Sequence, residues 1–356
     1  MSTSLEQRPA SPEIKAALVG KRLPRLAPLY TGLAAVAVAV VLNLTTGIQG
    51  VADTAVVAAV LFIIGQSAWS FAVEGRRHSV DRLFTTLIYA AFFAALAALV
   101  AIIVVTVMKG LDALSAEFLG RSMRNISPQK QGGGLYHALI GTIEQVLIAA
   151  AFAVPIGILT AIYLVEYSSK RKLGKAISFF VDGMTGIPSI IAGLVIYTFW
   201  VLTLGFQRSG FAGSLALTIL MIPVIVRSTE EMLKIVPNEL REASYALGVP
   251  KWKTILRIVL PTAIGGIITG VMLAVARVAG ETAPLLLTTF LSQSINYDPF
   301  KGAQASIPTF VWDQIASGTD ASLARAWAGA LVLIVLVMIL YLGARIVARF
   351  FAPKSE

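Results

Sequence analysis

Long apolar runs separated by short polar segments make up most of this chain. A helix needs about 20 mostly apolar residues to cross the hydrocarbon core of a bilayer. The stretches that satisfy this requirement lie near 29–46, 53–73, 83–108, 137–165, 176–204, 211–229, 258–283 and 324–346. The pattern therefore predicts an all-α fold, a polytopic membrane helix bundle of about eight transmembrane helices. The fifth stretch holds Asp182 and a break from Gly186 to Pro188, so it fits one straight helix least well.

Composition agrees with a membrane setting. Hydrophobic residues make up 57% of the chain and charged residues 13%, against roughly a half and a quarter in soluble globular proteins. Mean hydropathy is +0.80. The absence of cysteine excludes a disulfide framework and a thiolate metal site. His78 and His137 are isolated near predicted helix ends, which favours an interfacial role over metal binding or catalysis. Residues 1–28 lack the apolar core of a cleavable signal, so the first span is expected to direct insertion.

The lysines and arginines predict the orientation of the chain, because these residues concentrate on the cytoplasmic side of a membrane. With both termini inside, the cytoplasmic loops receive most of the 29 basic residues, namely Arg8, Lys15, Lys21, Arg22, Arg25, Arg76, Arg77, Arg82, Lys170, Arg171, Lys172, Lys175, Arg227, Lys234, Arg241, Lys251, Lys253, Arg257, Arg345, Arg349 and Lys354. The outer side receives Lys109, Arg121, Arg124, Lys130, Arg208, Lys301 and Arg325. The net charge of +10 then reflects topology and contact with anionic lipid. Nucleic-acid binding is a poor explanation because the basic residues are dispersed over several loops.

Two long polar loops are expected on the outer side. One covers residues 109–136 and includes the sequence QGGG. The other covers 285–323, where a short interfacial helix is predicted from Pro308 and the apolar positions that follow it, Phe310, Val311 and Ile315. In the seventh span, the GIITG stretch at 266–270 predicts close packing against another helix through its two glycines.

The most informative cytoplasmic segment is residues 233–261, LKIVPNELREASYALGVPKWKTILRIVLP. Asn238 is the expected N-cap of a short helix, with acidic residues in the favourable first turn, and Gly248 with Pro250 ends it. The pattern leaves two interpretations open. The helix is either an amphipathic connector at the membrane surface or a docking helix that transmits the motion of a partner.

Charges inside a span are the strongest candidates for function. The stretch ARVAGETAP, residues 276–284, places Arg277 past the middle of the seventh span, where an arginine costs about 2.5–3.5 kcal/mol on insertion scales. Glu281 follows four residues later, so the two side chains are expected to share a helix face and can pair. One interpretation is a self-neutralising pair that holds the bundle together. The other is that Arg277 binds an oxyanion through its rigid fork of donors, with Glu281 holding the arginine when the path is empty.

The GIPSI break supplies a second candidate element of a path. Pro188 lacks an N–H and frees backbone groups one turn back, and irregular backbone within a membrane is tolerated where it lines a wet cavity. Gly183, Gly186 and Ser189 are therefore candidates for lining such a cavity. A proline kink that serves packing alone explains the same pattern equally well.

An enzyme is a poor alternative for this chain. Its spans hold few acids, and two isolated histidines without any cysteine offer no catalytic cluster. The chain also lacks the G-x-x-x-x-G-K-[ST] loop that cradles nucleotide phosphates. Any ATP must therefore be bound by another subunit.

Part of the cytoplasmic segment resembles a known signature. In ABC importer permeases the EAA signature is Glu-Ala-Ala followed by Gly and then by Ile-x-Leu-Pro, and this chain matches it at Glu242, Ala243, Gly248, Ile258, Leu260 and Pro261. Ser244 stands where the family usually has a second alanine, which is one small residue for another. Further stretches are similar to the phosphate-importer permeases of the PstA family, namely QGGGLYHALIGT at 131–142, PIGILTAIYLVEY at 155–167, GIPSIIAGL at 186–194, ARVAGETAPLLLT at 276–288, SIPTF at 306–310 and AWAGALVLI at 326–334.

The resemblance implies an organisation for the whole chain. It covers about residues 83–346, where it implies a six-helix ABC importer (type I) permease core with an outer loop at 109–136 and an EAA coupling loop at 230–261. The remaining parts are a cytoplasmic N-terminal segment (1–28), an additional two-helix membrane segment (29–82) and a cytoplasmic C-terminal tail (347–356).

The resemblance also implies roles for residues. Residues 238–250 are expected to form a coupling helix that inserts into a separate ATPase subunit, with coupling residues Glu242, Ala243, Ser244 and Gly248. The expected substrate pathway residues are Arg277, Glu281, Ser189 and Thr282. No catalytic residue, metal or cofactor is expected in this chain, because ATP is bound by the partner ATPase.

The expected function is that of a permease subunit of an ATP-driven phosphate importer in the bacterial plasma membrane, forming half of the translocation path. The expected partners are a PstC-like second permease, a PstB-like ATPase dimer, a PstS-like extracytoplasmic phosphate-binding protein, inorganic phosphate and the lipid bilayer. Two alternatives remain open. One is a permease for another oxyanion such as molybdate, sulfate or phosphonate, and the other is a membrane scaffold that signals phosphate without moving it.

Overall fold

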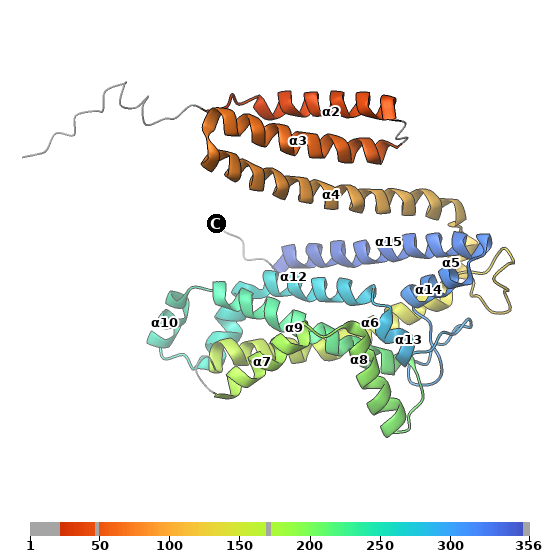
Figure 1. Ribbon diagram of the computed structural model, residues 1–356. Coiled ribbons are helices and arrows are strands. Elements are labelled where there is room, and N and C mark those ends of the chain that lie inside the picture. The colour runs from red at the N-terminus through yellow and green to blue at the C-terminus, as the bar shows by residue number, and fades with distance from the viewer. Residues whose placement is uncertain (1–21, 47–49, 169–171, 352–356) are drawn as a thin grey trace, which may run out of the picture. The chain divides into compact units, whose positions relative to one another are not determined.

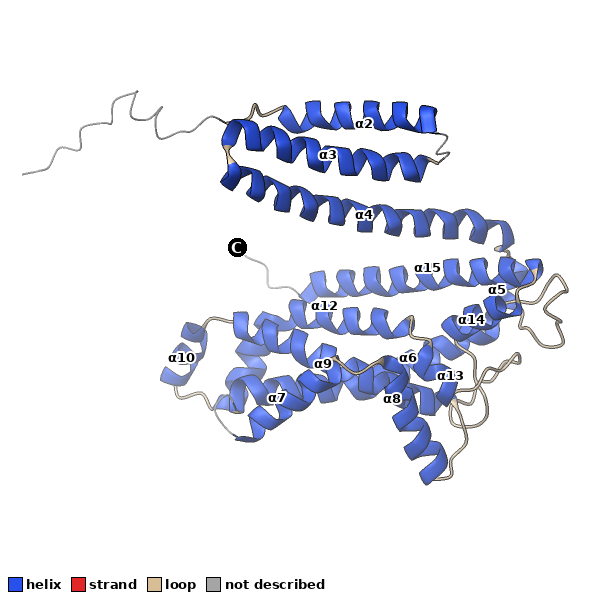
Figure 2. Cartoon of the chain, viewed as in Figure 1, coloured by secondary structure: helices blue, strands red, loops and turns tan. Residues whose placement is uncertain are grey.

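Residues 22–46, 50–168 and 172–351 are described by the computed structural model, and they form only helices, turns and loops (Figures 1 and 2). Most of the predicted segment 1–28 and part of the predicted tail 347–356 lie outside the described residues. The same holds for the basic residues Arg8, Lys15, Lys21, Lys170, Arg171 and Lys354. The chain divides into two compact units, Met1–Ile103 and Val104–Glu356.

The first unit contains α2 (Ala27–Thr46), α3 (Val51–Glu74) and most of α4 (Arg76–Ala113). Helices α2 and α3 pack together as a hairpin, and Thr31 Oγ1 of α2 donates to Gln66 Oε1 of α3 at 2.7 Å. Gly75 joins α3 to α4 with a φ of 85°, which glycine adopts without a Cβ clash. Helix α4 has 38 residues, so it extends well beyond the predicted span 83–108 and continues into the second unit.

The second unit contains the other described helices. The longest are α6 (Tyr136–Ile162), α9 (Gly210–Ile235), α12 (Leu260–Ala279) and α15 (Asp320–Phe351). The shorter ones are α5 (Ala116–Gly120), α7 (Lys172–Thr185), α8 (Ser189–Ile196), α10 (Asn238–Ala246), α11 (Lys251–Thr254), α13 (Ala283–Thr288) and α14 (Ile307–Ser317). Three π-helical segments extend or join them: η1 (Tyr163–Tyr167), η2 (Tyr197–Thr203) and η3 (Ile255–Val259).

The core of this unit lies where α6, α9 and α12 pack against one another. Ala149, Ala153 and Ala274 are fully buried there, because small side chains let membrane helices approach closely. The glycines of the GIITG stretch in α12 face α9, where a Cβ on Gly266 would meet Met232 and a Cβ on Gly270 would meet Ser228. The predicted packing role of this stretch is confirmed.

Among the described residues, seven helices are long and apolar enough to cross a membrane, and there are eight if a bent pair counts as one span. This finding agrees with the predicted bundle of about eight spans. The bent pair is Lys172–Thr185 with Ser189–Thr203, and the chain bends by 108° between its two parts. The predicted break is therefore confirmed, and 176–204 is not one straight helix. The bend falls at Pro188, which lacks an N–H and disfavours the helical conformation of the residue before it.

Arg325 of α15 holds part of the outer loop 109–136 in place. Its side chain is buried, and its guanidinium donates from Nη1 to the Lys130 carbonyl at 2.7 Å and from Nη2 to the Pro128 carbonyl at 2.9 Å. Its Nε donates to Gln314 Oε1 of α14 at 2.7 Å. The N–H donors of the Arg325 guanidinium are thus satisfied mainly by backbone carbonyl groups of this loop, for which the sequence predicted no secondary structure.

The short helix predicted within 285–323 is present as α14, and Ser306 caps it with its side chain. Phe310 of this helix is 1% exposed and packs edge-on against His137, with ring centroids 5.7 Å apart. His137 is itself 2% exposed. The predicted interfacial setting of His137 is therefore wrong, because α14 covers this end of α6 and buries the imidazole.

Candidate substrate path and coupling helix

Helix α10 follows α9 and precedes α11 in the sequence. It projects from one end of the second unit (Figure 1). Its N-cap is Pro237, so the predicted cap at Asn238 is wrong. Pro237 enters the helix with a φ of −59° and an extended ψ of 140°, and Asn238 is the first helical residue. Its side-chain oxygen accepts a hydrogen bond from Arg241 Nη1 at 3.4 Å. Gly248 follows the helix with a φ of 74°, which confirms the predicted C-terminal stop.

Arg241 ties α10 to two helices of the core. Its Nη2 donates to Glu166 Oε1 and to the Leu233 carbonyl, both at 2.9 Å, and its Nη1 donates to the Val236 carbonyl at 2.6 Å. The side chains of Arg241 and Glu166 are only 13% and 5% exposed. Lys251 adds a hydrogen bond from Nζ to the Glu166 carbonyl. Because Glu166 lies in η1 at the end of α6, this network connects α10 to both α6 and α9.

The predicted coupling residues lie on α10 or just after it. Glu242, Ala243 and Gly248 are exposed, whereas Ser244 is 4% exposed. Ser244 Oγ lies 2.8 Å from Thr254 Oγ1, which is fully buried in α11. The hydroxyl that departs from the EAA signature therefore has a partner and joins α10 to α11. The remaining surface of α10, which includes Glu242 and Ala243, is exposed in the described part of this chain.

Arg277 lies in the last turn of α12 with an exposed side chain. Helix α12 ends at Ala279 and Gly280 is its C-cap, so Glu281 lies beyond the helix. The predicted i, i+4 pairing of Arg277 with Glu281 is therefore wrong. Among the described residues Arg277 forms no ion pair and no side-chain hydrogen bond. Its donors face outward from this chain.

Ser189 and Thr282 lie on two elements that pack together. Ser189 begins α8, Thr282 is the N-cap of α13, and α8 packs against α13. The approach is close, since a Cβ on Gly193 would lie 2.5 Å from the Pro284 Cα atom. Both Ser189 and Thr282 are partly exposed. The fold thus places the break in the fifth span beside the segment that follows Arg277, which sequence spacing alone did not show.

A charged cluster between α7 and α9 was not predicted. Arg227, assigned from its position to the cytoplasmic loops, lies within α9 and forms ion pairs with Asp182 and with Glu230 Oε2, the latter at 2.5 Å. Its Nη2 also donates to Ser178 Oγ at 3.0 Å. The spacing of Arg227 and Glu230 was a readable signal for a helical pair. The pairing with Asp182 depends on the tertiary fold. It gives the carboxylate of Asp182, which lies in the predicted fifth span, a cationic partner.

A second polar cluster lies between α6 and the loop before α14. Gln304 Nε2 donates to Glu144 Oε2 at 2.6 Å, and Gln145 Nε2 donates to Gln304 Oε1 at 3.1 Å. Gln145 is fully buried. One carboxylate with two amides makes a structural hydrogen-bond network. In the part of the chain that is described, no group of three His, Asp or Glu side chains is placed to hold a metal ion.

A bundle of membrane-length helices with one broken span and a short exposed helix, α10, fits a membrane transport subunit. The chain belongs to the family of binding-protein-dependent transport system inner membrane components, which matches residues 153–354. Members of this family are multi-pass membrane proteins and not enzymes. Crystal structures with the same fold include a bacterial alginate ABC transporter, 17% identical with a TM-score of 0.54 over 78% of this chain and 97% of that one. Another is the MetNI methionine ABC transporter, 19% identical with a TM-score of 0.50 over 67% and 100%.

Relatives with higher identity are named as phosphate transport system permeases. PstA 1 of Mycobacterium tuberculosis (strain ATCC 25618 / H37Rv) is 46% identical over 282 residues, which are 79% of this chain and 91% of that protein. PstA of Mycobacterium leprae (strain TN) is 48% identical over 266 residues, or 74% and 87%. PstA of Pasteurella multocida (strain Pm70) is 39% identical over 276 residues, or 78% and 96%. The predicted resemblance to the PstA permeases is confirmed.

Proposed function

We propose that this chain is the permease subunit of an ATP-driven phosphate importer and supplies half of its translocation path. The observation that carries the proposal is the exposed guanidinium of Arg277, which has no carboxylate partner among the described residues of a chain whose relatives are PstA permeases. A guanidinium presents a planar fork of donors that fits the oxygens of a tetrahedral phosphate. An unpaired arginine in a membrane segment is costly, and a bound anion would offset that cost.

The other proposed path residues lie close to Arg277 in the sequence or on the helix that packs against α13. Glu281 and Thr282 follow it directly, and Ser189 lies on the helix packed beside α13. Because Arg277 is exposed in this chain alone, a second surface has to enclose the phosphate. A PstC-like permease supplies that surface in a heterodimer. An extracytoplasmic PstS-like protein delivers phosphate to the outer loops at 109–136 and 285–323.

Helix α10 couples the path to ATP. Its exposed residues Glu242, Ala243 and Gly248 dock on a PstB-like ATPase dimer, which binds the nucleotide. The network of Arg241 and Glu166 then passes motion of α10 to α6 and α9. From Lys251 to Arg277 the continuous helical segments rise about 39 Å at 1.5 Å per residue, so the coupling end and the phosphate end lie at opposite ends of one rod. Rigid helices that rock as a unit connect the two ends.

The orientation follows from this arrangement. The ATPase is cytoplasmic, so α10 and the basic ends of the spans lie inside the bacterial plasma membrane, and both termini face the cytoplasm. Arg277 then lies toward the outer side, where phosphate arrives.

The test is ATP-dependent uptake of labelled phosphate in cells without their own phosphate importer that express all four subunits. Arg277→Gln should assemble normally and lose most uptake, since a hydrogen bond to a charged group is worth about 1.5–3 kcal/mol, or on the order of 10- to 100-fold. Arg277→Lys keeps the charge without the fork and should retain an intermediate rate. Arg345→Gln, which replaces an exposed arginine near the end of α15 and away from the proposed path, should leave uptake unchanged.

Competition by sulfate and molybdate distinguishes phosphate from other oxyanions, because the guanidinium fork fits all of them. Uptake that resists both competitors supports phosphate as the substrate. Normal phosphate uptake by Arg277→Gln would show that Arg277 does not bind phosphate during transport. No phosphate uptake by the complete wild-type complex would point to another oxyanion or to a signalling scaffold.

A further inference from the structure

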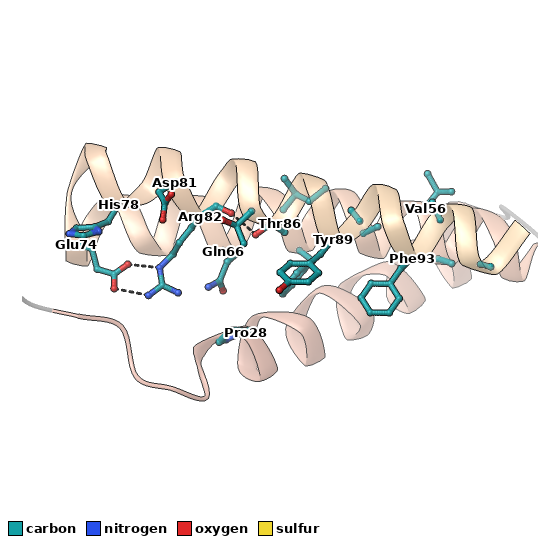
Figure 3. Close-up of a pocket in the computed structure, with 18 of the residues that line it drawn as sticks. Pro28, Val56, Gln66, Glu74, His78, Asp81, Arg82, Thr86, Tyr89 and Phe93 are labelled. Atoms are coloured by element: carbon teal, nitrogen blue, oxygen red, sulfur yellow. Dashed lines mark hydrogen bonds and ion pairs between the residues drawn. The ribbon is translucent and has the colours of Figure 1, made fainter. Parts of the chain in front are cut away.

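The first unit contains a cavity of about 1100 Å³ that the importer mechanism does not use. It lies between the hairpin of α2 and α3 and the facing side of α4 (Figure 3). Its walls are one face of α3, including Ala55, Val56 and Ala59, and one face of α4, including Tyr89, Ala90 and Ala94. These positions follow helical spacing, so each helix turns a single stripe toward the cavity. This volume is slightly above the range of roughly 300–1,000 Å³ for pockets that enclose small ligands.

One end of the cavity is closed by a network around Glu74. Its carboxylate accepts hydrogen bonds from Arg82 Nε at 2.6 Å, Arg82 Nη2 at 2.7 Å, Ser70 Oγ at 2.7 Å and the Leu23 N–H at 2.8 Å. Leu23 precedes α2, Glu74 ends α3 and Arg82 lies in α4, so the network ties the three helices together at this end. Because Glu74 is only 3% exposed and fully paired, it adds no net negative charge to the cavity.

The closed end is polar and mainly basic. Arg22 lines it. His78, Asp81 and the Glu74–Arg82 pair line it as well (Figure 3). A smaller hollow of about 540 Å³ adjoins it, shares His78 and Asp81, and adds Arg77. Asp81 is the one lining carboxylate outside the Glu74 network among the described residues. Arginines 22 and 77 outnumber it, so an anionic group is favoured here.

The lining changes from polar to apolar along α4. From His78 to Thr86 the helix rises about 12 Å, and from Thr86 to Ala97 it rises about 16 Å. Beyond Thr86 the α4 wall consists of Tyr89, Ala90, Phe93, Ala94 and Ala97. A rise of about 16 Å is close to half of the ~30 Å hydrocarbon core of a bilayer. The cavity thus has a headgroup-like section and an apolar section as deep as one leaflet.

We infer that this cavity binds one anionic phospholipid, with its phosphate at Arg22 and His78 and an acyl chain along Tyr89, Phe93 and Ala94. The arginines lie on the side that the distribution of basic residues assigns to the cytoplasm, where anionic lipid attracts basic segments. A transmembrane helix of another protein fits less well. It needs the full ~30 Å of apolar wall and would have to pass the end that Glu74 closes, whereas a lipid ends there with its headgroup.

The test uses the purified full-length chain and native mass spectrometry with dioleoyl phosphatidylglycerol and, separately, dioleoyl phosphatidylethanolamine. The wild type should bind one phosphatidylglycerol and prefer it over phosphatidylethanolamine. Arg22→Gln should weaken phosphatidylglycerol binding about fivefold, since each basic residue near an anionic lipid surface contributes about 1 kcal/mol. Inorganic phosphate added in excess should not displace the lipid, because the acyl chain supplies much of the affinity.

Variants that fill the cavity separate it from other lipid contacts. Ala94→Phe and Ala59→Phe place an aromatic ring in opposite walls and should each abolish the bound lipid, whereas Ala95→Phe on the other side of α4 should bind as the wild type does. Thermal unfolding shows that the variants are folded. The inference would be overturned if the wild type carried no lipid, or if Ala94→Phe and Ala59→Phe bound as much lipid as the wild type. Displacement of the lipid by inorganic phosphate, or capture of a second protein chain in place of lipid, would overturn it as well.

Discussion

Three arginines of the second unit differ in how their donors are used. Arg325 is buried and bonds to loop carbonyl groups and Gln314, and Arg241 is nearly buried and bonds to Glu166 and two carbonyl groups. Both are held by the fold. Arg277 is exposed at a helix end and has no such partner among the described residues. Of the three, it is therefore the one that we propose binds the transported anion.

Breaking the nearly buried ion pair of Arg241 and Glu166 should be strongly destabilising. Removing one partner leaves a nearly buried charge unpaired, which costs about 3–5 kcal/mol. Glu166→Gln and Arg241→Met should therefore each lower the unfolding temperature of the purified chain markedly. They should also uncouple ATP hydrolysis from uptake, because α10 would lose its link to α6.

The exposed pair of Glu117 and Arg121 is the matched control for this prediction. Its side chains are 58% and 67% exposed at an i, i+4 spacing with an N–O distance of 2.5 Å. Such a pair is worth only about 0.3–0.5 kcal/mol, so Glu117→Gln should have almost no effect on unfolding. Equal unfolding temperatures for Glu117→Gln and Glu166→Gln would show that the buried network does not hold α10.

At the scale of helices, local signals explain which predictions succeeded. The apolar runs predicted the spans, the end signals around Asn238 and Gly248 predicted α10, and Pro188 predicted the break, which is a bend of 108°. The end of α12 was readable as well, since Gly280 followed by Pro284 is a common helix stop. Because this stop lies between Arg277 and Glu281, the two residues do not share one helix face.

Contacts between distant segments were beyond the sequence. Arg241 and Glu166 are separated by 75 positions, and Arg227 and Asp182 by 45. No short-range pattern specifies such partners, because the packing of whole helices brings them together. For the same reason the sequence named Ser189 and Thr282 as candidates without placing their helices side by side.

The contact of α8 with α13 supplies a prediction at this scale. A methyl group at Gly193 would lie 2.5 Å from Pro284 Cα, so Gly193→Ala should push the helices apart at a cost of about 1–3 kcal/mol. Phosphate uptake should fall, because Ser189 and Thr282 border this contact. Gly343→Ala in α15 is the control, since no atom lies within 4 Å of a Cβ there and alanine favours the helix by about 1 kcal/mol. Normal phosphate uptake by Gly193→Ala would show that transport does not depend on the contact between α8 and α13.

At the scale of the whole chain, function is distributed along the helices. The coupling surface on α10 and the guanidinium of Arg277 lie at opposite ends of the helical rod that includes α12. In the proposed importer the bilayer lies between them, with the ATPase on one side and the phosphate-binding protein on the other. The lipid cavity adds a third element, in a unit that the family match at 153–354 does not include.

The absence of cysteine allows this topology to be tested with single-cysteine variants. Lys130→Cys lies in the outer loop, and Leu247→Cys replaces a side chain that is 83% exposed at the end of α10. A membrane-impermeant maleimide should label Lys130→Cys in intact spheroplasts and Leu247→Cys only after permeabilisation. Assembly with the ATPase should then protect Leu247→Cys, because α10 is buried in that interface. Labelling of Leu247→Cys in intact spheroplasts would reverse the orientation, and unchanged labelling with the ATPase present would place the docking surface elsewhere.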